Sequence, residues 1–230
     1  SSAASDVYKR QPYQCGTACY FNTVYNPMHI IEQAASVCYD SEPDFVRFKI
    51  AKGCAKTGHL SVYEHAYFTF HVKGISRACL AQLTRHRHFS FSVRSQRYCN
   101  ESRSEPVFPA STDEDQDGII ADAYDYAWDA YDRLIENGVA KEDARTVLPN
   151  GAPTELYISA NARALIEASH LRLCSRAQQE IRNMFDLMKK EIAPLSPEIA
   201  GMMVPQCETN PKYQFCTEGK SLSLIHISEP

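Results

Sequence analysis

The sequence lacks any long apolar run, since no stretch approaches the ~20 consecutive apolar residues that a transmembrane helix needs. No secretory signal, with a basic start and an apolar core, is visible either. Together these absences predict a chain that does not cross a membrane, and we expect a cytoplasmic protein. Internal repeats and low-complexity blocks are absent as well, which favours a single domain.

An excess of positive charge is also missing. The chain carries 24 Lys and Arg residues against 28 Asp and Glu residues, for a net charge of −4. This balance argues against a protein that coats nucleic acid, so any anion must be bound by local clusters of arginine. The 230 residues, 44% of them hydrophobic, are enough for a real core.

A paired cysteine framework is not indicated, although cysteine itself is plentiful. The nine cysteines are odd in number and mostly scattered through apolar or helical stretches, which favours reduced thiols in a cytosolic protein. Cys15 with Cys19, and Cys207 with Cys216, leave a metal clip open as the less favoured alternative. Their spacings are not the tight pairs that a zinc site prefers, so we expect no metal site.

The two ends of the chain carry an unusual relation to each other. Residues 6–11 read DVYKRQ and residues 222–227 read LSLIHI, and one DNA element read in opposite directions can encode both. The element looks like a transposase adapter used in sequencing libraries. We therefore interpret residues 1–11 and 222–230 as adapter-derived and expect them to be disordered. The natural domain is expected to occupy residues 12–221.

The hydrophobic pattern predicts an α+β fold, a single domain with a twisted, mainly antiparallel sheet flanked by helices. A strand is expected over 67–72, an extended segment over 89–98, and a long helix near residues 113–137 that ends at Gly138. Shorter helices are expected over 29–39, 43–56, 77–84, 141–148 and 177–192, with 156–168 leading into the last of them.

The most unusual stretch runs from Arg85 to Tyr98, where four arginines, two histidines and three serines stand within fourteen residues. Such a density of like charge is unfavourable unless a partner with several negative charges offsets it. If the segment is a strand, alternate side chains share one face, so Val93, Ser95 and Arg97 point to the face opposite Arg94. That face would offer a polar edge for a phosphate and a hydrogen-bonding ring.

Two other interpretations of this stretch stay open on composition alone. The arginines can form a solvated basic patch paired with the protein's own acids. Alternatively, arginine beside Phe89, Phe91 and Tyr98 resembles a stacking platform, which would make the chain a single-stranded RNA-binding module.

The order of residues favours a third interpretation. Arg85-His86-Arg87, then seven residues, then Ser95, with Gln82 three positions upstream, resembles the signature of flavin-dependent thymidylate synthases. Four further segments match the same family in the same order: Gly58–His65 with FTFHVKG, Ala144–Pro149, Asn161–Leu165, and Leu171–Ile181. The resemblance covers about residues 27–207.

The resemblance implies an α/β subunit that assembles as a homotetramer with active sites between subunits. It implies FAD-dependent reductive methylation of dUMP to dTMP, with methylenetetrahydrofolate as carbon donor and NADPH as reductant. It implies no nucleic-acid partner. A relative that keeps the flavin but has lost synthase activity is the remaining alternative.

The resemblance also assigns residues to each ligand. FAD would contact His59, Ser61, Glu64, Arg85, His86, Arg87, Asn161 and Arg163. The substrate dUMP would be held by Gln82, Ser95, Arg97, Arg145 and Arg172.

Two of these residues are candidates for a catalytic role. Ser95 has no obvious base beside it in the sequence, so we expect it to position dUMP rather than act as a nucleophile. Arg172 is the candidate for polarising the pyrimidine. The sequence departs from the family pattern at Val93, where several relatives have Glu, and at Glu167, where some have Asn.

Overall fold

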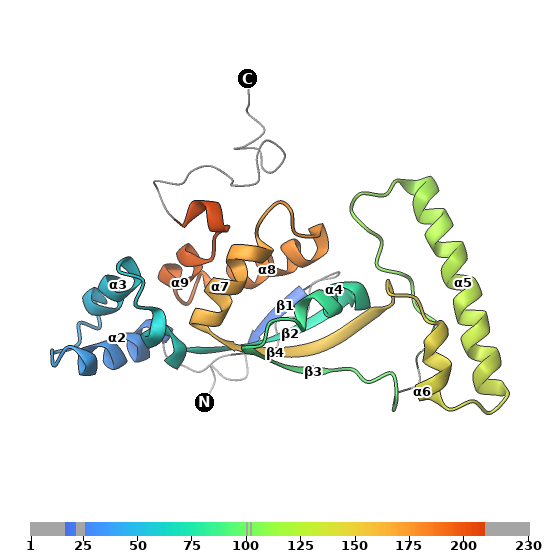
Figure 1. Cartoon of the computed structure of the whole chain (residues 1–230), viewed down its shortest axis with the longest axis horizontal. Helices are drawn as coiled ribbons and strands as arrows, with labels where there is room; N and C mark the ends of the chain where they lie inside the picture. Colours follow the sequence, from blue (N-terminus) through green and yellow to red (C-terminus); the bar gives the residue numbers. More distant parts are fainter. Residues whose placement is uncertain (1–16, 22–25, 100, 102, 210–230) are drawn as a thin grey trace, which may run out of the picture.

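A computed structural model describes residues 17–21, 26–99, 101 and 103–209. Its four strands, β1 (Thr17–Phe21), β2 (Tyr67–Ser76), β3 (Phe89–Val93) and β4 (Pro153–Asn161), form one sheet in the order β1-β2-β4-β3. All three strand pairs are antiparallel. The α+β class and the antiparallel sheet are therefore confirmed (Figure 1). The two adapter-like tails, residues 1–11 and 222–230, lie outside the described residues, so their interpretation stays a prediction.

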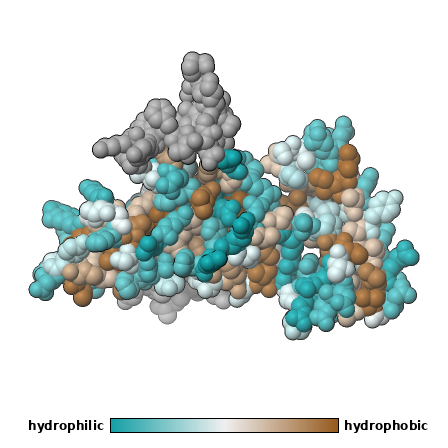
Figure 2. Space-filling view, viewed as in Figure 1, coloured by the Kyte–Doolittle hydropathy of each residue, from teal (hydrophilic) through white to brown (hydrophobic). Residues whose placement is uncertain are grey.

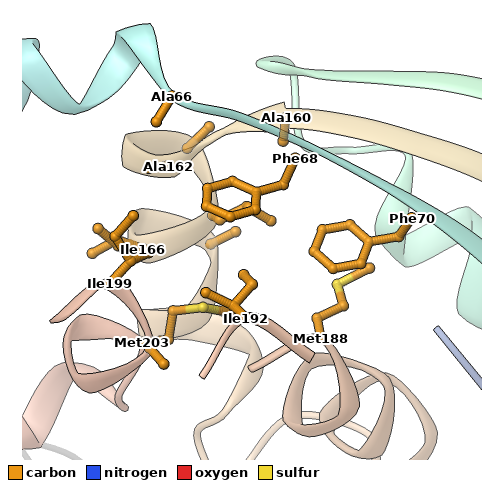
Figure 3. Close-up of a cluster of buried hydrophobic side chains, with 14 of the residues drawn as sticks. Ala66, Phe68, Phe70, Ala160, Ala162, Ile166, Met188, Ile192, Ile199 and Met203 are labelled. Carbon is orange, nitrogen blue, oxygen red and sulfur yellow. The ribbon is translucent and has the colours of Figure 1, made fainter. Parts of the chain in front are cut away.

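The main core lies between the sheet and three C-terminal helices, α7 (Ala162–Arg172), α8 (Gln179–Ile192) and α9 (Pro197–Met202). Side chains alternate between buried and more exposed along both central strands, as expected when one face of a sheet is covered. Figure 3 shows Phe68 and Phe70 packed against Ile166, Met188 and Ile192. The helical layer therefore covers one face of the sheet.

Two helices begin directly at strand ends, and their sequences supply the caps. The Ser76 hydroxyl accepts a hydrogen bond from Cys79 N at 3.0 Å where β2 enters α4 (Arg77–Leu83). Asn161 Oδ1 accepts from Ala164 N at 2.8 Å where β4 enters α7. Because β2 and β4 are antiparallel, α4 and α7 begin at opposite ends of this strand pair.

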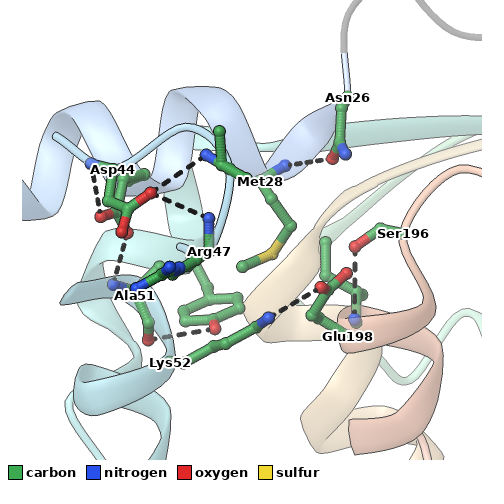
Figure 4. Close-up of polar contacts among 12 residues, drawn as sticks. Asn26, Met28, Asp44, Arg47, Ala51, Lys52, Ser196 and Glu198 are labelled. Carbon is green, nitrogen blue, oxygen red and sulfur yellow. Dashed lines mark hydrogen bonds and ion pairs between the residues drawn. The ribbon is translucent and has the colours of Figure 1, made fainter. Parts of the chain in front are cut away.

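The N-terminal part contains α2 (Pro27–Cys38), α3 (Lys49–Lys56) and a 3₁₀ turn, η1 (Leu60–His65). The helix expected over 43–56 is wrong in its first half, because it begins only at Lys49. The Asp44 side chain accepts from Val46 N and Arg47 N in a local turn, and Phe48 takes a left-handed conformation with φ 52°. Figure 4 shows the polar contacts of this region.

The buried carboxylate of Glu32, on α2, holds the Asp44 turn and the start of α3 by hydrogen bonds. It accepts hydrogen bonds from the backbone N–H groups of Asp44, Ile50 and Ala51 at 3.1, 3.3 and 2.8 Å. Ala51 O in turn accepts from the Tyr63 hydroxyl at 3.2 Å. Glu32 is thereby linked through α3 to η1.

The long helix is confirmed as α5 (Glu114–Glu136), followed by α6 (Lys141–Ala144) and η2 (Arg145–Val147). Asp113 caps α5 through a capping box with Gln116. These elements enclose a second, smaller core of Tyr124, Trp128, Tyr131, Ala144 and Ala152. They form a lobe beside the sheet, and Figure 2 shows it as a separate bulge with hydrophobic patches on its surface.

Two other expectations need correction. The extended segment ends at Val93, and residues 96–98 form a turn, so the predicted alternation through Tyr98 is wrong. The segment 156–168 is the end of strand β4 followed by α7, not one run leading into a later helix. A short 3₁₀ turn, η3 (Gln206–Glu208), ends the described chain. None of the described helices is long and apolar enough to span a membrane.

Five of the cysteines in the described part of the chain are free thiols: Cys38, Cys54, Cys79, Cys99 and Cys174. Cys15 and Cys216 lie outside the described residues. Within the described part of the chain, no cluster of His, Cys, Asp and Glu is arranged to hold a metal ion.

Candidate functional site

The arginine-rich turn joins α4 to β3. Arg85 and Arg87 are exposed, and no ion pair within the described part of the chain involves either of them. His86 between them is half-buried, with its ring stacked on Phe89 at a centroid distance of 5.1 Å. The turn therefore presents two free guanidinium groups on either side of a fixed imidazole, which is the donor set that a phosphate-bearing ligand needs.

Arg172, at the end of α7, reaches this turn. Its Nε donates to His86 Nε2 at 2.8 Å, and its Nη2 donates to Gln82 O at 2.9 Å. A guanidinium has only donors, so His86 Nε2 must accept and the proton of a neutral His86 must sit on Nδ1. The structure thus brings together Gln82, His86 and Arg172 from two helices and a turn.

Burial lowers the pKa of His86 from 6.5 to about 4, and the positive charge of Arg172 lowers it further in the same direction. Burial also lowers the pKa of Arg172, with the nearby charge of Arg85 as the second cause. His86 is therefore neutral at neutral pH, and its Nδ1–H is a fixed hydrogen-bond donor.

We predict that His86 stays neutral until the pH approaches about 4. The unfolded chain binds this proton below 6.5, while the folded chain does so only near pH 4, so stability is full above pH 6.5 and is lost as the pH falls through that window. Nitrogen NMR of the His86 imidazole checks the tautomer and midpoint. Thermal unfolding of His86→Gln should depend less on pH between 4 and 6.5, and an imidazole titrating near 6.5 would contradict the assignment.

The side-chain amide of Gln82 is held by Gln178, a residue to which we assigned no role from the sequence. Its Nε2 donates to Gln178 Oε1, which fixes the direction of the Gln82 amide. Gln178 belongs to the segment that resembled the family, and that match was the only signal that could have found it. The amide of Gln82 is therefore oriented rather than free to rotate.

A second group lies around η1 and the start of α7. Arg163 donates from Nη1 to Glu64 at 2.8 Å and from Nε to Glu167 at 2.7 Å. These two carboxylates raise the pKa of Arg163, with Glu167 the larger cause. Glu167, noted as a departure from the family pattern, thus acts as a partner of Arg163.

The other members of this second group surround that ion pair. His59 and Ser61 are exposed, and His59 Nδ1 lies 3.3 Å from the Tyr39 hydroxyl. Asn161 uses its Oδ1 for the cap of α7, which leaves its NH₂ group to donate to a ligand. This set of donors and charges fits a cofactor that carries phosphates and a hydrogen-bonding ring.

A third group lies beyond the C-terminal end of β3. Arg97 makes a two-nitrogen contact with Glu142 Oε2, at 2.9 Å from Nε and 2.8 Å from Nη2. Arg145 Nε donates to the backbone O of the same Glu142 at 2.9 Å. Ser95 Oγ accepts from Arg97 N at 3.2 Å. Glu142, which sequence analysis missed, therefore orients both arginines from α6.

The first and third groups lie at opposite ends of β3. Gln82 and His86, with Arg172 in contact with them, lie at its start, and Ser95 and Arg97 follow its last residue. Five residues of strand cover about 15 Å at about 3.3 Å per residue. The residues expected to hold dUMP are therefore split between two places on one chain.

Comparisons with known proteins agree with this chemistry. Residues 21–198 match the family described as "Thymidylate synthase complementing protein". The flavin-dependent thymidylate synthase of Geobacter sulfurreducens is 39% identical over 207 residues, covering 84% of this chain and 88% of that protein. The enzyme of Sulfurisphaera tokodaii is 40% identical over 152 residues, covering 65% of this chain and 59% of that protein.

A solved structure shares the fold. The UMP/dUMP methylase PolB from Streptomyces cacaoi, bound with 5-Br dUMP, superposes with a TM-score of 0.69 and 25% sequence identity. The match covers 84% of this chain and 96% of that one. Together with the Arg-His-Arg turn and its partners, these matches show that the chain belongs to the flavin-dependent thymidylate synthase family.

Proposed function

We propose that this chain catalyses the FAD-dependent reductive methylation of dUMP to dTMP, with methylenetetrahydrofolate as carbon donor and NADPH as reductant. The observation that carries the proposal is the contact of Arg172 with His86 and Gln82. His86 and the backbone of Gln82 fix the Arg172 guanidinium, and Gln178 orients the Gln82 amide. A fixed charged donor beside an oriented amide can bind a uracil edge and stabilise negative charge that develops on its carbonyls.

The flavin would be held by the exposed Arg85 and Arg87, by His86, and by the group around Arg163. When bound, FAD supplies the redox chemistry of the reaction. His86 donates from Nδ1 without titrating at neutral pH, which suits a ring acceptor better than a phosphate. Arg85 and Arg87, free of carboxylate partners within the described chain, suit the phosphates.

The dUMP phosphate would be bound by Ser95, Arg97 and Arg145 at the far end of β3. Glu142 holds both guanidinium groups, Arg97 through its carboxylate and Arg145 through its backbone oxygen. Gln82 and Arg172 would bind the pyrimidine.

The separation of these two groups supports a site that is completed by a second copy of the chain, as in a homotetramer with active sites between subunits. One copy would supply the phosphate-binding group and its neighbour the residues around His86. The exposure of Arg85, Arg87 and Arg97 in the single chain fits that arrangement. We also propose a cytoplasmic location, in line with the reduced cysteines expected from the sequence.

We expect Ser95→Ala to retain measurable turnover, with a higher KM for dUMP. The Ser95 hydroxyl accepts from Arg97 N, and no base contacts it among the described residues, so it lacks the partner that a nucleophile needs. Steady-state kinetics checks this. Complete loss of turnover with dUMP binding intact would instead indicate covalent catalysis.

The function is tested with protein lacking residues 1–11 and 222–230. Purified protein should carry or take up FAD, oxidise NADPH, and form dTMP from dUMP and methylenetetrahydrofolate. It should also rescue growth of a thymidine-requiring bacterium. Flavin binding without dTMP formation would favour a relative without synthase activity. Colourless protein that binds single-stranded RNA with strong salt dependence would favour the RNA-binding alternative.

A further inference from the structure

Arg77 is the first residue of α4, and it reaches the loop that follows β3. Its Nη2 donates to Arg94 O at 3.1 Å. The side chain is half-buried, and its Nε is buried with no hydrogen-bond partner among the described residues. A guanidinium placed this way is costly to bury, so its position calls for a role beyond a surface charge.

The hydrogen bond from Arg77 acts on one peptide unit. Arg94 N donates to Glu155 O of β4 at 2.9 Å, so Arg94 is fixed from its amide side as well as from its carbonyl side. In a trans peptide the carbonyl and the following N–H point in opposite directions. With Arg94 O directed at Arg77, the N–H of Ser95 is directed away from Arg77. Arg77 therefore sets the direction of the Ser95 amide.

Positive charge gathers around this peptide. The charges of Arg145 and Arg94 both lower the pKa of Arg77, after burial as the first cause, while Glu101 opposes them. The Arg94 guanidinium lies 3.6 Å from Glu101, whose side chain is only 11% exposed. Arg97 lies on the same loop and is already paired with Glu142. An added anion with two negative charges would offset the repulsion that remains.

We propose that Arg77 is a positioning residue for the 5′-phosphate of the nucleotide substrate. It holds the Arg94–Ser95 peptide so that the Ser95 amide and hydroxyl converge with Arg97 and Arg145 on that phosphate. The inference deepens the proposed function and rests on it. Arg77 acts through the loop and does not itself take part in the chemistry.

The test is the variant Arg77→Met, which keeps the aliphatic stem and removes all donors. Losing one hydrogen bond to a charged donor should raise the KM for dUMP about tenfold. Activity on deoxyuridine, which has no phosphate, should change by less than about twofold if the effect passes through the phosphate loop. FAD affinity, measured by quenching of flavin fluorescence, should stay unchanged. An equal loss on both substrates, or an unchanged KM for dUMP, would overturn the proposal.

Two further variants separate the role of the Arg77 fork from that of its charge and from a general effect of losing an arginine. Arg77→Lys retains the charge but lacks the planar fork, so it should also raise the KM for dUMP; full rescue by lysine would contradict a positional role. Arg133→Met, an exposed arginine on α5, is the control and should match the parent protein. If the parent protein does not convert dUMP, the proposed function fails. Calorimetry of dUMP and deoxyuridine binding to the parent protein and to Arg77→Met then still tests whether Arg77 increases affinity for the phosphate.

Discussion

Arg172→Ala should lower turnover of dUMP on the order of a hundredfold or more, while FAD stays bound. The variant removes the donor that polarises the pyrimidine, and losses of that size follow the removal of one donor from a charge-stabilising site. It also frees His86 Nε2 and Gln82 O, which both accept from Arg172. Steady-state kinetics with dUMP and the absorbance of bound flavin check the two halves of this result.

Two comparisons separate this effect from a general loss of structure. Arg172→Lys keeps a charge but cannot contact His86 and Gln82 with separate nitrogens, so it should recover only part of the rate. A double-mutant cycle with His86→Gln should show strong coupling, because the two side chains are joined by one hydrogen bond of 2.8 Å. Unchanged activity of Arg172→Ala would remove this residue from the site.

Glu32→Ala should lower the free energy of unfolding by about 3–5 kcal/mol, a typical cost of leaving buried donors without their charged acceptor. The side chain is fully buried and accepts from three backbone N–H groups, at Asp44, Ile50 and Ala51. Truncation leaves all three without an acceptor and opens a cavity beside them. Urea denaturation of the flavin-free protein measures the change.

The structure offers a matched control for this prediction. Glu136→Ala alters an exposed glutamate at the end of α5 and should change stability by less than about 0.5 kcal/mol. Glu32→Gln keeps one acceptor oxygen and should fall between the parent protein and Glu32→Ala. A loss below about 1 kcal/mol in Glu32→Ala would show that water replaces the carboxylate.

The parts of the fold that depend on local signals could be predicted from the sequence. The long helix was placed within one residue at each end, because Asp113 caps its start and Gly138, with φ 80°, follows its end. Helix α4 was found through Ser76 for the same reason. In both cases the residues that decide the boundary lie within one turn of it.

The predictions were wrong where residues distant in the sequence determine the local conformation. Residues 43–48 have a helical pattern, but Glu32 and the left-handed Phe48 hold them in a turn. The extended segment was expected to continue through Tyr98, yet pairing with β4 ends at Val93 opposite Leu156. Neither the carboxylate on another helix nor the length of the partner strand can be read from these segments alone.

The candidate site shows the same division. The Arg-His-Arg turn and the Ser95 position followed from the order of residues in one segment. The contacts that give these residues their chemistry did not, because Arg172 is 86 residues from His86 and Gln178 is 96 residues from Gln82. The role of Glu142 was not predicted, because an exposed glutamate on a short helix has no distinguishing sequence signal. Whether these residues bind FAD and dUMP stays a prediction.

The second core, around Trp128, shares no buried residue with the core beneath the sheet. Each core can therefore melt with its own cooperativity, and the α5 lobe can open through a partial unfolding event while the sheet persists. Arg145 and Glu142 belong to that lobe, whereas Ser95 belongs to the loop beside the sheet. The affinity for a nucleotide phosphate is thus thermodynamically linked to the folding of the lobe, and a bound phosphate would raise the melting temperature of α5.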